Sequence, residues 1–282
     1  MKTYLVTGGT RGFGLAIARR LAHTDKVILG VRDVAKARAL GFDEVHALDL
    51  SSLAKVQSFV REWKTPINAL INNAGLQQID RTHLTDEGIE ETVAVNHLGT
   101  YALTVGLLPF VEDKVIFVGS GTQALHSMGF RGARYTSIAA LARGDTDTTD
   151  AKQAGLDRYA TTKFLNTMSA LGLSRRHPDK TMVCLDPGLM PGTGLARTYS
   201  LGMRMIWSTV MPLVGWLMPD VSSPRRSAKS IAWLLRQSDL KNGATYSYHR
   251  ELSAPKWLAP GATDPQLAEN ILLETDAFLR DR

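Results

Sequence analysis

The sequence contains almost no cysteine, since Cys184 is the only one in 282 residues. A single thiol cannot form an intramolecular disulfide, and chains without disulfides fit a reducing compartment. We also expect no secretory signal, because Met1–Val6 leads directly into a glycine-rich turn with no room for an apolar signal core. We therefore expect a cytoplasmic protein.

No linker rich in Ser, Gly or Pro divides the sequence, and no period of about 20–50 residues indicates a repeat array. With 44% hydrophobic residues, the chain can bury a large core as one α/β unit. We therefore predict a single domain over residues 1–282.

Stretches in which basic and aromatic residues alternate are absent. The formal net charge is +6, but Lys and Arg are scattered among acidic residues, whereas a nucleic-acid site needs a basic patch. His97 and His126 have no Cys or acidic partners at the spacing of a metal site. We expect neither nucleic-acid nor metal binding, and we expect structural or substrate-facing roles for these histidines.

Seven short apolar segments bounded by turn residues alternate with helical patterns. Short buried strands separated by crossover helices imply a parallel, doubly wound sheet, in which ligands bind at the carboxyl ends of the strands. The sequence therefore predicts an α/β fold of Rossmann type with about seven strands. The predicted strands are Tyr4–Val6, Val27–Leu29, Val45–Leu48, Ala69–Ile71, Val115–Val118, Met182–Leu185 and Ala244–Ser247, and the first helix is Gly12–His23.

A glycine-rich turn lies between the first strand and the first helix. Glycine lets the backbone turn tightly and approach a pyrophosphate, whose charge the helix N-terminus stabilises. Because of its place between strand and helix, the turn predicts a dinucleotide site. The residues that we assign to it are Thr7, Gly8, Thr10, Arg11, Gly12, Phe13 and Gly14.

Arg32 follows the second strand, where an acidic residue would bind a ribose 2′-hydroxyl in an NAD site. Together with Arg11 it offers two cations for the 2′-phosphate of NADPH. Asp33 is the alternative, since its carboxylate could accept a hydrogen bond from a ribose hydroxyl. We expect NADPH (NADP+) as the cofactor.

The ends of three further strands carry residues that can line the cofactor. Asp49, followed by Leu50, is placed after the third strand to accept from an adenine amino group. Asn73, Ala74 and Gly75 offer close backbone after the fourth strand. Pro187, Gly188 and Leu189 follow the sixth strand and complete the predicted cofactor site.

Tyr159 and Lys163 lie four residues apart in a helical pattern, so their side chains share one face. A phenol with an ordinary pKa of roughly 10 is a poor proton relay at neutral pH, and a cation within a few Å lowers that pKa. Such a pair also occurs by chance on solvated helices. Beside a dinucleotide turn, however, it indicates hydride-transfer chemistry.

These motifs together resemble the short-chain dehydrogenase/reductase family over essentially the whole chain. The resemblance implies a Rossmann-type sheet, NAD(P), and a Ser-Tyr-Lys-Asn tetrad. The matching positions are the Thr-Gly-x-x-x-Gly-x-Gly turn at 7–14, Asn72-Asn73-Ala74-Gly75, Asn96, Ser120, Tyr159 with Lys163, and Pro187-Gly188.

The resemblance implies a role for each tetrad residue. Tyr159 would donate a proton to the developing alkoxide, and Lys163 would acidify Tyr159 and hydrogen-bond the nicotinamide ribose. Ser120 would donate to the carbonyl oxygen, a role that its place at a strand end fits better than that of Thr122. Asn96, expected in a helix, would hold a water that links Lys163 to solvent.

Within the family, the chain is similar to the branch that contains protochlorophyllide reductases, retinol dehydrogenases and some polyketide ketoreductases. The similarity rests on the long segment between Ser120 and Tyr159, on Thr193-Gly194-Leu195 after Pro187-Gly188, and on Tyr246-Ser247-Tyr248. The photoactive enzyme of that branch has a cysteine directly after its Pro-Gly, where this chain has Leu189. We therefore do not expect light-driven chlorophyll chemistry.

Two segments, near 121–157 and 189–225, are predicted as substrate lids, with surface decoration as the alternative for the first. The second contains the apolar stretch Leu201–Asp220, which is too short for a confident bilayer span. It could cover a bulky apolar substrate, pack in the core or at a subunit interface, or touch a membrane surface. Because Met and Trp adapt well to large apolar ligands, we favour the first role.

The sequence thus predicts an NADPH-dependent ketoreductase acting on a hydrophobic carbonyl compound, such as a polycyclic or polyketide-like one. An alcohol or retinol-type dehydrogenase working in the oxidative direction is the alternative among enzymes. A catalytically silent NADPH-sensing regulator is the alternative from another class, although intact Ser120, Tyr159 and Lys163 argue against it. The sequence leaves open whether the chain is a monomer or a homo-oligomer.

Overall fold

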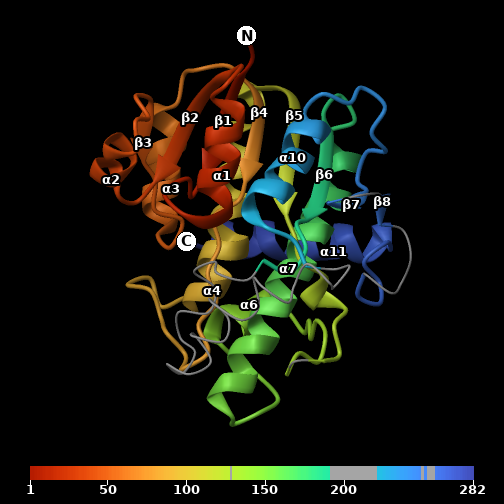
Figure 1. Cartoon of the computed structure of the whole chain (residues 1–282). Helices are drawn as coiled ribbons and strands as arrows, with labels where there is room; N and C mark the ends of the chain where they lie inside the picture. Colours follow the sequence, from red (N-terminus) through yellow and green to blue (C-terminus); the bar gives the residue numbers. More distant parts are fainter. Residues whose placement is uncertain (128, 191–220, 249–250, 253–257) are drawn as a thin grey trace.

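The computed structural model describes residues 1–127, 129–190, 221–248, 251–252 and 258–282 (Figure 1). Within them an eight-stranded sheet has the order β3-β2-β1-β4-β5-β6-β7-β8. The first seven strands pair in parallel, and β8 pairs antiparallel to β7. The strands are β1 (Thr3–Thr7), β2 (Lys26–Val31), β3 (Val45–Ala47), β4 (Ile67–Asn72), β5 (Val111–Val118), β6 (Thr181–Asp186), β7 (Thr245–Ser247) and β8 (Glu251–Leu252).

The sheet confirms the predicted doubly wound fold, with each of the seven predicted strands in place. Strand order reverses between β1 and β4, which is the switch point where ligands bind in such sheets. The short β8 was not predicted. The predicted third strand extends one residue too far, because Leu48 follows the last residue of β3.

Helices cover both faces of the sheet. In addition to the α-helices, a π-helical turn η1 (Ala94–Leu98) precedes α5, and the 3-10 turns are η2 (Leu108–Phe110) and η3 (Gly121–Gln123). The α-helices are α1 (Gly12–Leu21), α2 (Val34–Ala39), α3 (Leu53–Glu62), α4 (Glu91–Val93), α5 (Gly99–Leu107), α6 (Ile138–Arg143), α7 (Ala151–Arg176), α10 (Pro224–Leu234) and α11 (Pro265–Arg280).

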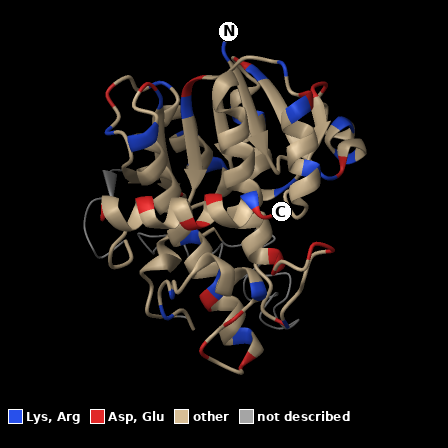
Figure 2. Cartoon of the chain, turned by 180° about the vertical axis from the view of Figure 1, so that it is seen from behind, with Lys and Arg blue, Asp and Glu red and all other residues tan. Residues whose placement is uncertain are grey.

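Side chains alternate between two cores, which explains why the strands are continuous apolar runs. Tyr4 and Val6 of β1 pack on the face that α1 and α10 cover, and Figure 1 views this face. Leu5 points to the opposite face, where α3, α5 and α7 pack. A third apolar cluster joins α6, α7, η1 and α11. The view from behind shows Lys and Arg interspersed with Asp and Glu, as the scattered sequence positions predict (Figure 2).

The first predicted lid, 121–157, contains more regular structure than a loop. Ser137 caps α6 by accepting from Ala140 N, and Asp150 caps α7 by accepting from Lys152 N and Gln153 N. Because these caps start helices inside the segment, the part of it from Ala151 onward belongs to α7, the helix that carries Tyr159.

The second predicted lid, 189–225, lies mostly outside the described residues, and so does its apolar stretch Leu201–Asp220. Its two ends are described and meet, since Leu189 and Val221 form a parallel bridge and Ser222 N donates to Leu189 O over 2.8 Å. The chain therefore leaves and re-enters the described fold at one place, next to the end of β6.

One stretch of the described residues, Glu91–Phe110, is long and apolar enough to cross a membrane, with a mean hydropathy of 1.2. However, 72% of its most apolar window is buried inside the fold. It has the pattern of a core helix.

Candidate active site

The predicted site residues gather at the carboxyl ends of the parallel strands. The turn after β1, the segments after β4 and β6, and Ser120 after β5 all lie at this edge because the strands run in one direction. α7 and η1 bring Tyr159, Lys163 and Asn96 to the same edge.

The glycine turn after β1 is packed too closely for any side chain at its centre. Gly8 has φ +72°, and a Cβ built on Gly14 would lie 2.2 Å from Gly8 O and 2.4 Å from Asn73 Nδ2. Both positions therefore require glycine. Phe13 in the same turn packs into the core with Ile17, whereas Thr10 is half-buried and Arg11 is exposed.

The N-terminus of α1 lacks a side-chain cap of the kind that α2, α3 and α7 have. Arg11 occupies the cap position without a side-chain hydrogen bond, and the first turn contains no acidic residue. By contrast, Asp33, Ser52 and Asp150 cap α2, α3 and α7. A pyrophosphate at the start of α1 would accept hydrogen bonds from the backbone amides of the first turn, so the glycine turn fits a dinucleotide.

Thr7 and Asn73 fasten the β1 turn to the end of β4. Asn73 Nδ2 donates to Thr7 O over 2.8 Å, and the backbone amides of Asn73 and Ala74 donate to Thr7 Oγ1 over 3.1 and 2.9 Å. These bonds cross the switch point, so they fix the two backbone segments that would face a bound cofactor.

Arg32 and Asp49 line the same cavity, which has a volume of about 550 Å³ and continues along α3. Asp33 Oδ1 accepts from Lys36 N over 2.8 Å, so Asp33 serves as a helix cap while Arg32 stays exposed. Burial raises the pKa of Asp49, but hydrogen bonds from Ser51 and Lys55 outweigh it and lower the pKa overall. Asp49 is therefore an ionised acceptor. Leu50 is buried in the core beside it.

Tyr159 and Lys163 lie on one face of α7, as predicted. Lys163 Nζ lies 5.6 Å from the centroid of the Tyr159 ring. Lys163 Nζ also donates to Val118 O, the last residue of β5, over 2.9 Å. A Cβ built on Gly75 would lie 3.6 Å from Lys163 Nζ and 3.3 Å from Asn96 Oδ1. The structure thus brings Tyr159, Lys163, Gly75 and Asn96 together.

Burial lowers the pKa of Lys163 to about 8, against raising contributions from Cys184 and Asp186. Burial also raises the pKa of the Cys184 thiol to about 12, so this thiol is neutral at physiological pH. Asp186 is therefore the charged group that favours the Lys163 ammonium. At pH 7 Lys163 remains mostly protonated.

Ser120 caps η3, where its Oγ accepts from Thr122 N over 3.3 Å, and it is half-buried at the end of β5. Thr122, the competing hydroxyl, is buried. Ser120 is therefore the more accessible of the two hydroxyls.

Asn96 lies in the π-helical turn η1, and π turns are frequent at functional sites. Its amide makes two bonds to the backbone of Leu76: Leu76 N donates to Oδ1 over 2.8 Å, and Nδ2 donates to Leu76 O over 2.9 Å. Nδ2 also donates to Thr162 Oγ1 over 3.1 Å. These bonds hold the segment after β4 against α7, and the water-holding role remains a prediction.

Two neighbouring residues were missed in the sequence. Asn166 Nδ2 shares the acceptor Val118 O with Lys163, over 3.1 Å. Its spacing of three residues from Lys163 on one helix could have identified it. Asp186, at the end of β6, could have been identified because polar residues at strand ends recur in this site; its Oδ1 accepts from Gly188 N over 3.0 Å.

His97 has a structural position. It is fully buried, its Nε2 lies 3.0 Å from Thr275 Oγ1 of α11, and burial lowers its pKa to about 3. His126 is exposed near Gly132. Among the described residues no group of His, Cys, Asp and Glu could hold a metal ion.

Comparison with known proteins gives matches over most of the chain. The family model for short chain dehydrogenases matches residues 2–137. A probable oxidoreductase of Streptomyces lividans is 31% identical over 284 positions, which cover 93% of this chain and 88% of that protein. Protochlorophyllide reductase B of Oryza sativa subsp. japonica is 28% identical over 305 positions, which cover 95% and 75%.

Among solved structures, a 3-ketoacyl-(acyl-carrier-protein) reductase from Brucella melitensis, complexed with NADH, superposes with a TM-score of 0.62. The two chains are 22% identical, and the match covers 87% of this chain and 96% of the other. At this identity the likeness supports the fold alone.

Proposed function

The chain belongs to the short-chain dehydrogenase/reductase family, and on that premise we propose that it is an NADPH-dependent ketoreductase. Membership makes it an NAD(P)-dependent oxidoreductase of carbonyl and alcohol groups. The proposal adds the phosphorylated cofactor, the reductive direction and a hydrophobic, for example polycyclic or polyketide-like, substrate.

One observation carries the proposal: a buried ammonium lies close to a tyrosine ring at the carboxyl ends of the strands. Lys163 Nζ is 5.6 Å from the Tyr159 ring centroid and is held by the carbonyl of Val118. A fixed cation at this distance favours the phenolate form that remains after proton donation. The arrangement supports Tyr159 as general acid.

The chain's own residues then have the following roles. Tyr159 donates its phenolic proton to the carbonyl oxygen as negative charge develops there. Ser120 donates a hydrogen bond to the same oxygen and stabilises that charge. Lys163 stabilises the tyrosinate left behind, and Asp186 keeps Lys163 protonated. Bound NADPH supplies the hydride.

The preference for NADPH is supported by the two exposed cations, Arg11 in the β1 turn and Arg32 after β2. Asp33, the competing ribose acceptor, is engaged as the cap of α2. A guanidinium binds phosphate through paired, charge-assisted hydrogen bonds. Arg11, Arg32 and the amides at the start of α1 would hold the phosphates.

The test is a screen of NADPH oxidation against aromatic polyketides, steroids and retinoids, with Tyr159→Phe as the matched variant. We expect Tyr159→Phe to reduce kcat by about 100-fold or more, because the general acid is lost, and to leave NADPH affinity largely intact. NADPH binding is measured by fluorescence titration of both proteins. Unchanged turnover in the variant would remove Tyr159 from the mechanism.

The same screen, run with NADP+ and the corresponding alcohols, measures the oxidative direction. A higher kcat/KM for alcohol oxidation than for carbonyl reduction at pH 7 would contradict the reductive assignment. NADPH binding without turnover in either direction would contradict enzyme function.

A further inference from the structure

A short segment after β5, residues 129–135, lies along the first half of α7. Gln153 Nε2 donates to Gly129 O over 3.1 Å at one end of this contact. Arg134 N donates to Thr161 Oγ1 over 2.9 Å at the other end. The segment therefore runs alongside the two turns of α7 that contain Tyr159.

The same segment is also tied to the residues that follow Ser120. Gly132 N donates to Leu125 O over 3.0 Å, and Ala133 N donates to Gln123 O over 2.8 Å. Gly132 has φ +76°, a conformation that favours glycine. The segment thus bridges the strand end that carries Ser120 and the helix that carries Tyr159.

Phe130 and Arg131, adjacent in this segment, have different partners on α7. The Phe130 ring centroid lies 6.5 Å from that of Tyr159, with the ring planes inclined by 48°. The Arg131 guanidinium pairs instead with the buried carboxylate of Asp157. Arg131 therefore fixes the segment to α7, and Phe130 becomes the aromatic group beside the proposed general acid.

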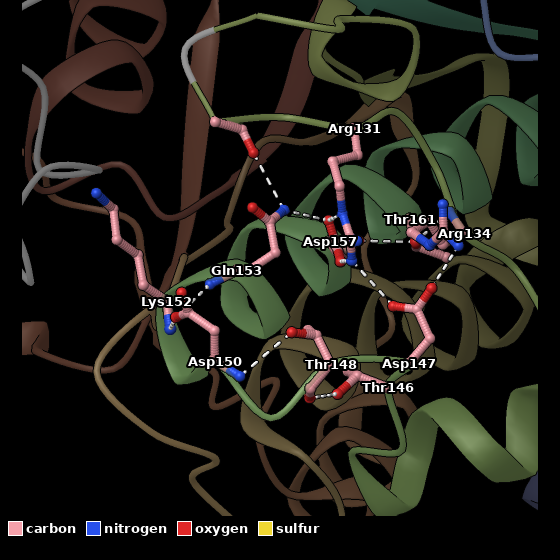
Figure 3. Close-up of polar contacts among 11 residues, drawn as sticks. Arg131, Arg134, Thr146, Asp147, Thr148, Asp150, Lys152, Gln153, Asp157 and Thr161 are labelled. Atoms are coloured by element: carbon pink, nitrogen blue, oxygen red, sulfur yellow. Dashed lines mark hydrogen bonds and ion pairs between the residues drawn. The ribbon is translucent and has the colours of Figure 1, made fainter.

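The attachment extends into an ion-pair network (Figure 3). Arg131 Nη2 also donates to Asp147 Oδ1 over 2.9 Å, and Arg134 donates to the second oxygen of Asp147. Gln153 Nε2 donates to Asp157 Oδ1 over 2.7 Å. The buried carboxylate of Asp157 thus has two donors, which offset the cost of removing it from water.

We propose that Phe130 is a specificity-determining residue, an aromatic wall that selects carbonyl substrates with a planar apolar substituent, and that Arg131 positions it. The proposal rests on the function proposed above. A substrate carbonyl that accepts from Tyr159 lies within reach of the Phe130 ring, because the two ring centroids are 6.5 Å apart, and the half-buried Phe130 has apolar surface left to cover. Planar aromatic groups gain most there, because they can stack on that ring.

The turnover test compares 2-acetylnaphthalene with 2-butanone, two methyl ketones that differ in their second substituent. The wild-type protein is expected to have the higher kcat/KM for the naphthyl ketone. We define the ketone ratio as kcat/KM for 2-acetylnaphthalene divided by kcat/KM for 2-butanone. Phe130→Ala is expected to lower the ketone ratio by about 10-fold or more, mainly by raising KM for the naphthyl ketone. Phe130→Leu should retain part of the preference.

The matched control is Phe278→Ala, which removes another half-buried phenylalanine, one on α11 that contacts Arg282. This variant is expected to keep the wild-type ratio. An unchanged ratio in a folded Phe130→Ala protein would overturn the proposal, and so would an equal loss in Phe278→Ala.

A binding test separates this inference from the proposed function. Naphthalene fluorescence measures the Kd of 1-(2-naphthyl)ethanol in the presence of NADPH, a complex of two reduced partners that cannot react. Phe130→Ala is expected to raise this Kd about 10-fold. If the wild-type protein reduces neither ketone nor any compound of the carbonyl screen, the proposed function fails, while a rise in Kd in Phe130→Ala would still support the aromatic wall and an unchanged Kd would overturn it.

The role of Arg131 is tested by Arg131→Met and Arg131→Lys. Arg131→Met is expected to lower the ketone ratio as Phe130→Ala does, because kcat/KM falls more for 2-acetylnaphthalene than for 2-butanone. Arg131→Lys should recover part of the ratio, because it restores the positive charge opposite Asp157. A purely structural role would lower kcat for both ketones equally. That outcome would overturn the positioning role.

Discussion

At the scale of single residues, the site depends on a lysine that burial makes unusually easy to deprotonate. With its pKa lowered to about 8, Lys163 titrates close to physiological pH. Its ammonium is retained by two features: the carbonyl of Val118 accepts from it, and the carboxylate of Asp186 is the charged group opposing its deprotonation. Small changes around this lysine should therefore be visible in pH profiles.

Asp186→Asn should shift the alkaline limb of the kcat/KM profile to lower pH. Removing the carboxylate removes a raising contribution, so the Lys163 pKa falls below about 8 and the ammonium is lost at lower pH. Asparagine keeps an oxygen to accept from Gly188 N, which preserves the local turn. The control is Asp179→Asn, an exposed carboxylate paired with Lys180. Identical alkaline limbs in wild type and Asp186→Asn would contradict this role.

Arg32→Asp should move cofactor preference from NADPH toward NADH. A charge-assisted hydrogen bond contributes about 1.5–3 kcal/mol, so the ratio of kcat/KM for the two cofactors should change by roughly 10- to 150-fold. Arg38→Asp on α2 makes the same change of charge at another exposed site. An equal shift in both variants would indicate the general field of the protein and not a contact from Arg32.

At the scale of elements, a buried ion pair connects the helices that carry the catalytic candidates. Glu90 caps α4, which continues into η1 and Asn96, and Arg158 precedes Tyr159 on α7. Arg158 Nε lies 3.3 Å from Glu90 Oε1, and both side chains are almost completely buried. Burial raises the pKa of Glu90, and Arg158 opposes that rise.

Arg158→Met should destabilise the protein by about 3–5 kcal/mol, because it leaves the Glu90 carboxylate buried without its partner. The double variant Glu90→Gln/Arg158→Met should lose less stability than the sum of the two single variants. Urea unfolding of all four proteins measures this coupling. Simple additivity would show that the pair does not act as a unit. Asp145→Asn, in the exposed pair with Arg143, should change little.

At the scale of the whole molecule, α11 joins parts of the chain that are far apart in sequence. Tyr101 Oη of α5 donates to Asp276 Oδ1 over 2.7 Å, and Arg176 at the end of α7 pairs with both Asp276 and Glu269. Glu274 accepts from Tyr135 Oη over 2.8 Å, next to the start of α6. The last helix thus fixes α5, α6 and α7 relative to one another.

Asp276→Asn should lower the free energy of unfolding by about 1–3 kcal/mol, since Arg176 and Tyr101 lose a charged acceptor. Calorimetry and urea unfolding should show one cooperative transition in both proteins. Glu62→Gln on α3, whose carboxylate accepts from Ser58, is the control for loss of a surface charge. Equal stability of wild type and Asp276→Asn would contradict the role of α11 in fixing α5, α6 and α7 relative to one another.

The sequence predicted the features that short-range pattern determines. Apolar runs gave the seven parallel strands, and glycines gave the turn, because backbone crowding leaves no room for a side chain at Gly8 and Gly14 and Gly12 has a positive φ of 52°. It did not predict contacts between distant segments. The pair Glu90–Arg158, the bond from Asn96 to Leu76 and the attachment of Arg131 to Asp157 depend on helix packing, which no local periodicity encodes. The start of α7 was also missed, because a single cap at Asp150 decides it.

The uncapped first turn of α1 has a consequence for the lifetime of the protein. Until an anion binds to the backbone amides in the first turn of α1, the folded state is less stable. A nucleotide at about 100 times its Kd adds roughly 2.7 kcal/mol to the free energy of unfolding. Proteases cleave the transiently unfolded form, so the protein without bound nucleotide is degraded faster than the protein with it. Cellular abundance would then follow the supply of the nucleotide, with surplus protein removed when that supply falls.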